Sequence, residues 1–308
     1  MDSLIKIEGK PLEKLMDVVS NAIGNICKPW QIVREARAEE KAESIKAIGQ
    51  AKIKAILDGD LDKAQYLETI NERLVAKETK RQKNIENVVA VAGKVLQAEE
   101  TVSEESVNPD WATRFFDIAQ DVSDEEMQNL WGQILAGEIK QPQSYSLRTM
   151  ETLRNMTKDE ALLFQKVAQF TLYQGEAFLF SFANVLDKFG VTYANLIRLS
   201  EIGLIQPGDN IVKNIFSNSV DANSYITYGS LILIINIKAN ASKITFPIKV
   251  LTTAAKELLK LISINPNLDY FKELASHIKR SDVNVSYSKI IDVLDDGRIS
   301  YDSSVIAL

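Results

Sequence analysis

The chain has 308 residues and carries 36 Lys and Arg against 42 Asp and Glu, so its net charge is −6. Apolar residues make up 45% of it and charged residues 25%, which excludes a disordered chain, and 13 Gly with 7 Pro exclude a collagen-like one. The single cysteine and single histidine exclude, within one chain, a disulfide framework, a cysteine-based zinc or iron–sulfur site and a polyhistidine metal site. We therefore predict neither a metal site nor a bound cofactor.

The first 30 residues predict an amphipathic segment. Apolar side chains recur at helical spacing from Leu12 to Ile26, and Lys28-Pro29-Trp30 ends the helix because proline disfavours helical backbone in the residue before it. Such a stripe could lie in a membrane interface with Trp30 among the headgroups. Residues 1–30 hold four basic and four acidic side chains, so we favour packing against another helix or another subunit. The residues that would make either contact are Leu15, Val19, Ile23, Ile26 and Trp30.

The sequence also suggests a location. It shows no secretory leader at its start. Its longest apolar run, residues 231–235, is far shorter than the ~20 residues that a membrane-spanning helix needs. We expect a cytoplasmic protein.

Residues 31–102 predict a helical stalk. Residues 31–100 hold 13 basic and 13 acidic side chains and no proline, and most of them are good helix formers. Asp58-Gly59-Asp60 breaks this segment because aspartate and glycine favour turns, and a second helix should begin near Leu61. The expected structure is a long helical hairpin or coiled-coil stalk. Each helix has only a narrow apolar seam, so the stalk should need a partner, most simply a second copy of the chain.

Residues 110–175 predict a compact helical core, and residues 101–160 carry most of the excess negative charge, with 5 basic and 12 acidic side chains. A short helix would bury Trp111, Phe115, Phe116 and Ile118. Ser123 with Glu126 fits a capping box before a helix with an apolar stripe from Met127 to Leu135. Thr157 with Glu160 fits a second capping box before a helix over 158–173.

Residues 176–308 predict an α+β domain. We expect helices over 177–188 and 192–202, strands near 225–238 and 243–250, a helix from Thr252, another over 267–280, and a hairpin that joins 283–290 to 298–301. Helices followed by a β-hairpin are typical of a winged helix. The fold class expected for the whole chain is therefore mainly α, with a smaller α+β part that is winged-helix-like.

A winged helix could place residues 192–202 in a DNA major groove. Asn195, Arg198 and Ser200 would then read the bases, although Glu201 would oppose the phosphates. Residues 161–308 carry a net charge of only +1, whereas DNA-binding domains usually neutralise several phosphates. We therefore favour protein contacts over nucleic-acid binding for this domain, and both stay open.

Four segments carry a resemblance to a known family: residues 117–123, 130–138, 146–153 and 159–164. Together with the Lys28-Pro29-Trp30 entry into a charged helix, they resemble a bacterial family known only as a domain of unknown function. The same helical core is similar, more distantly, to the abortive-infection alpha proteins of anti-phage defence. The resemblance implies a role in defence or growth arrest, and it brings no catalytic motif.

No constellation of residues predicts an enzyme. The acidic cluster around Asp124 is explained by a helix start, where carboxylates favour the helix dipole. Residues 58–62 begin like a calcium loop but lack its glycine at the sixth position and its closing glutamate. His277 and Cys27 have no triad partners, and phosphate-binding glycine loops are missing. Three hypotheses remain: a non-enzymatic protein that assembles with copies of itself and with another protein, a nucleic-acid-binding regulator, and a membrane-acting effector.

Overall fold

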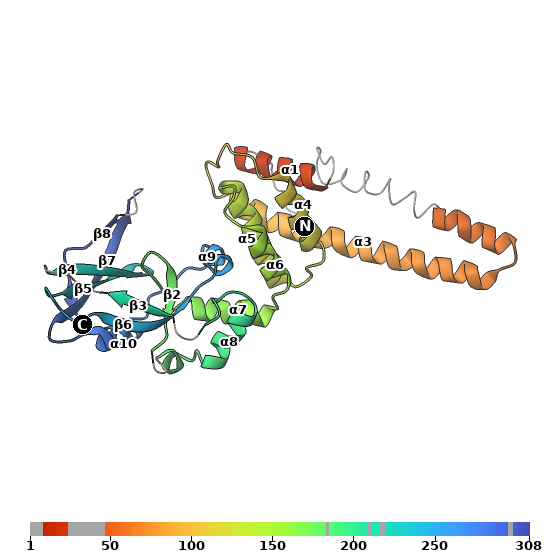
Figure 1. Cartoon of the computed structure of the whole chain (residues 1–308). Coiled ribbons are helices and arrows are strands. Elements are labelled where there is room, and N and C mark those ends of the chain that lie inside the picture. Colours follow the sequence, from red (N-terminus) through yellow and green to blue (C-terminus); the bar gives the residue numbers. More distant parts are fainter. Residues whose placement is uncertain (1–8, 24–46, 183–184, 209–210, 216–219, 295–297) are drawn as a thin grey trace. The chain divides into compact units, whose positions relative to one another are not determined.

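The computed structural model describes residues 9–23, 47–182, 185–208, 211–215, 220–294 and 298–308. The chain divides into two compact units, Met1–Leu147 (unit 1) and Arg148–Leu308 (unit 2). The described part of unit 1 is helical, and unit 2 combines helices with a sheet (Figure 1). The fold is therefore mixed α+β. The boundary falls within the predicted core 110–175, and the four-part division of the chain stays a prediction.

Unit 1 is a helical bundle with a hairpin. Its elements are α1 (Lys10–Ile23), helical residues 47–57, α3 (Leu61–Leu96), α4 (Pro109–Ala119) and α5 (Glu125–Lys140). The C-terminal half of α3 packs against α5, and its Val88, Ala92 and Leu96 are fully buried. The predicted stalk is therefore only partly a stalk, because residues 84–96 form part of the bundle core. The N-terminal half of α3 continues away from the bundle (Figure 1).

Aromatic side chains hold the bundle together as the apolar spacing predicted. The Phe115 ring lies 5.1 Å from the Trp111 ring and 5.2 Å from the Trp131 ring. The Trp111 indole N–H donates to the Tyr145 carbonyl at 2.7 Å. The buried Glu138 carboxylate accepts from the backbone N–H groups of Gln143 and Tyr145 at 2.7 and 3.0 Å. The chain that follows α5 is thus fixed by a buried carboxylate whose hydrogen bonds offset its desolvation.

The described residues of unit 2 form a nine-stranded antiparallel sheet with helices around it (Figure 1). The helices are α6 (Leu147–Arg154), α7 (Lys158–Ala168), the 3-10 helix η1 (Leu186–Phe189), α8 (Tyr193–Glu201), α9 (Thr253–Leu259) and α10 (Leu268–Ile278). The strands are β1 (Thr171–Tyr173), β2 (Ala177–Phe180), β3 (Val212–Ile215), β4 (Ala222–Tyr228), β5 (Leu231–Ile237), β6 (Ile244–Val250), β7 (Val283–Val293), β8 (Ile299–Tyr301) and β9 (Ile306–Ala307).

The strand order is β3-β6-β2-β1-β4-β5-β7-β8, and β9 also pairs with β7. Aromatic side chains of α10 cover the sheet: Tyr270 and Phe271 contact Tyr228 of β4 with ring centres 5.6 and 5.4 Å apart. Tyr270 is fully buried, and burial raises the pKa of its hydroxyl far above the usual range. Its oxygen accepts from the Phe180 N–H at 3.2 Å, which ties α10 to β2.

Several predictions for this unit are confirmed. Helices α8, α9 and α10, strand β6 and the β7–β8 pairing lie where the sequence placed them. Thr157 caps α7 in a capping box with Glu160, and Thr252 caps α9. These signals are local, because a side-chain oxygen needs only the next three backbone N–H groups to act as a cap.

Other predictions are wrong. The helix predicted over 158–173 ends at Ala168, and the one predicted over 177–188 is β2 followed by η1. The strand predicted over 225–238 is the β4–β5 hairpin, which turns at Gly229 with a φ of 52°. In unit 1 the N-cap of α5 is Asp124 rather than Ser123. Short apolar runs such as residues 177–180 fit buried strands and buried helices equally well, so spacing alone cannot separate them.

The winged-helix assignment is not confirmed. The β1–β2 hairpin, which sequence spacing assigned to helices, lies inside the sheet between β4 and β6. The predicted wing is therefore part of a much larger sheet, whose pairings join strands distant in sequence. The coiled-coil pairing of two stalks likewise stays a prediction.

Candidate functional site

The outer part of unit 1 is a helical hairpin. Helical residues 47–57 lead into a turn at Asp58-Gly59-Asp60, as predicted, where Gly59 has a φ of 77°. The Asp60 carboxylate accepts from the Lys63 N–H at 3.1 Å and caps α3. An ion pair of 2.6 Å between Lys52 and Glu68 joins the two helices. The turn and the ion pair set the two helices antiparallel.

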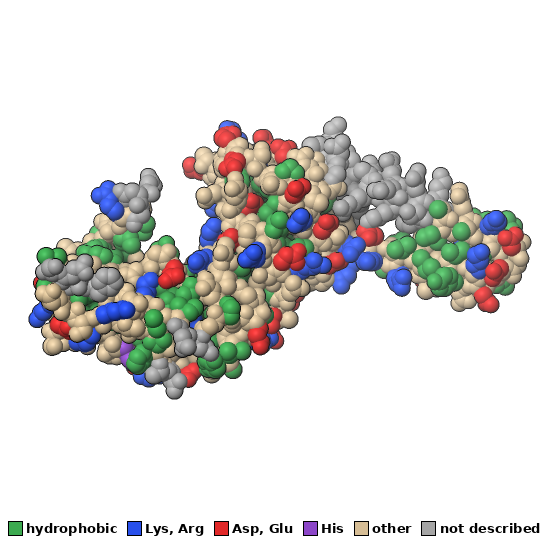
Figure 2. Space-filling view, in the orientation of Figure 1, with side chains coloured by type: hydrophobic (Ala, Val, Ile, Leu, Met, Phe, Trp, Pro, Cys, Tyr) green, Lys and Arg blue, Asp and Glu red, His purple; other side chains and the backbone are tan. Residues whose placement is uncertain are grey.

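The hairpin buries very little of its own apolar surface. Within the described residues 47–83, only Ala55 and Ala64 are buried. Large apolar side chains on both helices are exposed instead, with Leu57, Leu61 and Tyr66 at 81%, 69% and 67%. Hydrophobic side chains gather on one face of the hairpin in Figure 2. We call the exposed set the hairpin patch: Ile53, Ile56, Leu57, Leu61, Tyr66, Leu74 and Val75.

The residues of the N-terminal segment that were predicted to contact a membrane or another subunit are partly covered by the chain itself. Leu15 and Val19 are buried where α1 packs in the bundle, and Ile23 is half-buried. Ile26 and Trp30 lie outside the described residues. Because the chain itself covers Leu15 and Val19, a membrane or a second copy could contact them only if α1 left the bundle.

The residues predicted to read DNA lie on α8 and serve its internal contacts. The side-chain amide oxygen Oδ1 of Asn195 accepts from the Thr192 N–H at 2.9 Å in a capping box. Arg198 donates to the Glu160 carboxylate at 3.3 Å and joins α8 to α7. Ser200 is half-buried. Two of the three side chains, Asn195 and Arg198, thus make contacts with other residues of the same chain.

The ionisation of Glu160 maintains the contact between α7 and α8. The backbone N–H of Thr157 donates to its carboxylate at 2.9 Å, and this bond, more than Arg198, lowers the pKa of Glu160. The carboxylate therefore stays ionised and keeps both its cap and its ion pair at neutral pH.

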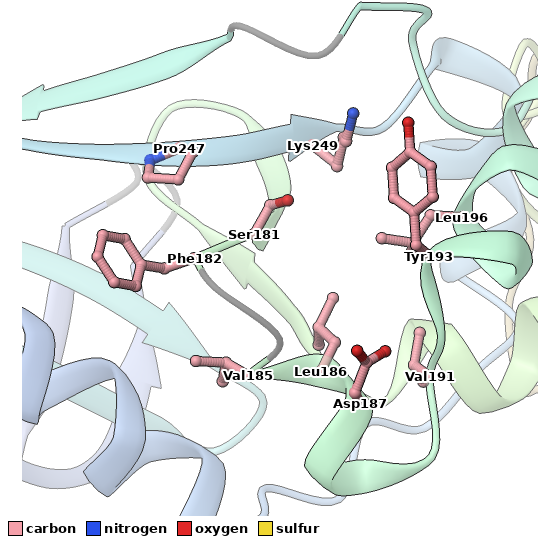
Figure 3. A pocket seen from close by; sticks show the side chains of 10 residues that line it. All are labelled: Ser181, Phe182, Val185, Leu186, Asp187, Val191, Tyr193, Leu196, Pro247 and Lys249. Carbon is pink, nitrogen blue, oxygen red and sulfur yellow. The ribbon is translucent and has the colours of Figure 1, made fainter.

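A cavity of about 300 Å³ lies beside α8 in unit 2 (Figure 3). Its lining residues are Ser181, Phe182, Val185, Leu186, Asp187, Val191, Tyr193, Leu196, Pro247 and Lys249. The buried Lys249 ammonium donates to the Gly208 carbonyl at 3.0 Å, and the Asp187 carboxylate points into the cavity. The described lining has no histidine or cysteine, and we assign no reaction to it. Sequence reasoning missed this cavity because it placed a helix over residues 177–188.

Two further observations concern chemistry and membranes. Among the described residues, no three His, Cys, Asp or Glu side chains are grouped to hold a metal ion. None of the helices that the structure describes combines the length and apolarity that crossing a bilayer requires.

Neither the curated proteins nor the solved structures contain a match to this chain. A family model matches residues 68–275, about two thirds of the chain, from within α3 to within α10. Residues 47–67 of the hairpin lie outside the match. The match confirms the resemblance to a domain of unknown function, and the chain belongs to the family described as "Protein of unknown function (DUF2806)".

Proposed function

We propose that this chain is a non-enzymatic protein that assembles with copies of itself through the hairpin patch, and that unit 2 contacts a further protein. The exposure of large apolar side chains along the hairpin carries the proposal. Folded monomers seldom leave apolar patches of this kind uncovered unless a partner binds them. Because the two helices of the hairpin bury only two alanines, their contact with each other contributes little hydrophobic stabilisation.

The energetics favour a partner on this face. Burying one exposed leucine or isoleucine side chain contributes about 1.5–3 kcal/mol. Several such side chains, each buried twice in a symmetric pair, can offset the loss of translational and rotational freedom on association. The charge-neutral composition of the stalk also supports the proposal, because no excess of one charge sign opposes assembly.

Removing part of the patch tests the proposal. The double variant Ile53→Ser/Leu57→Ser alters two patch residues one helical turn apart, and it should weaken self-association by about 100-fold or more. The measurement is sedimentation velocity from roughly 1 to 100 μM, the range of typical weak-to-moderate affinities. The matched control is Gln65→Ser/Thr69→Ser, also one turn apart and exposed but polar. Equal association of wild type and patch variant would count against the proposal.

Nucleic-acid binding through α8 is the second proposal. Its support is the Arg198 side chain, which is 47% exposed although paired with Glu160. Duplex DNA binding that weakens steeply with salt and is lost on Arg198→Glu would support it. Absence of binding at low salt would reject it.

We also propose a biological role for this assembly, namely anti-phage defence. It is supported by the resemblance of the helical core, residues 111–164, to abortive-infection alpha proteins. A culture that expresses the wild-type chain should then survive phage challenge better than a culture that expresses the Ile53→Ser/Leu57→Ser variant. Equal phage yields in both would count against this role.

A further inference from the structure

We propose that unit 2 binds a neutral oligosaccharide on the face of its sheet opposite α10. Tyrosines from three separate strands lie on this face beside a row of uncharged hydrogen-bonding side chains. The inference concerns unit 2 alone, so it goes beyond the proposed function and does not depend on self-association.

Strand register places the three tyrosines on one face, which we call the tyrosine face. Residues directly opposite in a sheet point to the same side, and so do residues two apart along a strand. Tyr173 of β1 opposes Thr227 of β4, which is two residues from Tyr225. The ring centre of Tyr301 on β8 lies 6.1 Å from that of Tyr225. Tyr228, the neighbour of Thr227, contacts α10, so the tyrosine face is the opposite one.

The tyrosine rings are available to a ligand. Tyr173 and Tyr225 are 53% and 37% exposed, and Tyr301 is half-buried. Tyr173 and Tyr225 are diagonal neighbours on adjacent strands, for which a separation of about 7–8 Å is typical. Each ring offers a rigid apolar surface with a hydroxyl at its edge. A row of three such rings suits a chain of successive sugar rings better than a single small molecule.

Asparagines form a second row on the tyrosine face. Asn223, Asn236 and Asn284 oppose one another across β4, β5 and β7, and the Asn236 amide donates to the Asn223 side-chain oxygen at 3.0 Å. Asn223 and Asn284 are exposed. The side chains of Asn284 and the nearby Ser286 make no hydrogen bond with other described residues. An amide group both donates and accepts, so this row matches the paired donor and acceptor character of sugar hydroxyl groups.

The lack of charge on the tyrosine face indicates the class of ligand. Charged residues make up 25% of the chain, yet no described side chain on this face of β1, β4, β5, β8 and β7 up to Ile290 is charged. A nucleic acid would need lysine or arginine beside its phosphates, and a membrane surface would need apolar side chains in place of amides and hydroxyls. A neutral sugar chain needs neither, because its C–H groups pack on aromatic rings and its hydroxyls hydrogen-bond.

Isothermal titration calorimetry tests the proposal with three neutral oligosaccharides: cellohexaose, maltohexaose and N-acetylchitohexaose. Wild type should bind at least one of them with a dissociation constant of roughly 10 μM to 1 mM. Tyr173→Ala/Tyr225→Ala removes two rings and should weaken that binding about 10-fold or more. Tyr173→Phe/Tyr225→Phe keeps the rings and should bind within about 3-fold of wild type. The matched control is Tyr193→Ala on α8, where the tyrosine is 56% exposed, and it should bind like wild type.

A second variant and the salt concentration give independent readouts. Asn284→Ala/Ser286→Ala removes side chains that have no hydrogen-bond partner among the described residues, so it should keep the fold and weaken binding about 3-fold or more. Binding by wild type should change little between ~0.05 and ~0.5 M salt, because no charge takes part. Circular dichroism verifies the fold of each variant, and the Asn284→Ala/Ser286→Ala result decides if Tyr173→Ala/Tyr225→Ala unfolds.

Weaker sugar binding by both alanine variants, with little effect of salt, supports the proposal. Absence of binding of all three sugars to wild type, or equal binding by wild type and a folded Tyr173→Ala/Tyr225→Ala, overturns it. Oligo(dT) that binds through the same tyrosines with a steep salt dependence also overturns it, because the face would then stack bases. A monomeric wild type that binds sugar would contradict self-association and leave this inference standing.

Discussion

At the residue scale, Gly132 fixes the spacing of two helices in unit 1. A Cβ atom there would lie 2.5 Å from the Cβ and Cγ1 atoms of Val91 and 2.8 Å from the Val88 carbonyl oxygen. Neither contact can relax cheaply, because Val91 is branched at Cβ and the oxygen belongs to the backbone of α3. The absence of a side chain at residue 132 therefore lets α5 approach α3 closely.

This close approach predicts that Gly132→Ala destabilises unit 1 by about 1–3 kcal/mol. Helix propensity alone predicts the opposite sign, because alanine is favoured over glycine in a helix by about 1 kcal/mol. Gly49→Ala is the matched control: Gly49 is also helical, and a Cβ there would meet nothing within 4 Å. Thermal unfolding followed by circular dichroism should show a lower midpoint for Gly132→Ala and an unchanged or higher one for Gly49→Ala. A midpoint for Gly132→Ala at or above wild type would contradict the packing described.

At the element scale, the contact between α7 and α8 predicts a pH dependence. The Thr157 N–H and Arg198 lower the pKa of Glu160 from its usual 4.5. A lowered pKa means that this stabilisation is complete above pH 4.5 and is lost as the pH falls through the lower, folded-state value. Glu160→Gln should therefore lower the unfolding midpoint at pH 7, and the gap to wild type should close towards pH 3.

The control for this prediction is Glu151→Gln on α6, whose ion pair with Arg154 spans 3.7 Å between side chains that are more than half exposed. An ion pair of this kind contributes little, so its variant should show no comparable gap at any pH. A gap for Glu160→Gln that persists unchanged at pH 3 would mean that the carboxylate charge does not hold this contact.

The elements also show what sequence reasoning can reach. The hairpin turn at Asp58-Gly59-Asp60 and the caps at Thr157 and Thr252 were predictable because each depends on a few adjacent residues. The burial of Trp111, Phe115 and Phe116 followed from helical spacing. Strand β2 was not predictable, because its four buried residues become a strand only through pairing with β1 and β6. The resulting nine-stranded sheet depends on partners far apart in sequence.

The candidate sites also have features that the sequence predicts and features that it does not. The narrow apolar seam of the stalk predicted a need for a partner, and this stays a prediction. The contacts of Arg198 and the burial of Leu15 were out of reach, because each depends on a residue of another element: Glu160 on α7, and the bundle around α1. Helical spacing identifies an apolar stripe but not which part of the chain covers it.

At the scale of the whole molecule, we predict a dimer whose contact is made by the hairpin of unit 1. The bundle core, which includes residues 84–96 of α3, does not depend on the dimer, because its apolar side chains are buried within one chain. Patch variants should therefore remain folded as monomers.

Self-assembly of the chain can be decided by its native mass, measured on the purified protein as a function of concentration. Light scattering at low salt, from roughly 1 to 100 μM, should show a mass that rises to twice the 34.4 kDa of one chain. The Ile53→Ser/Leu57→Ser variant should stay at the mass of one chain with unchanged helix content. A wild-type mass of 34.4 kDa at every concentration would contradict self-assembly.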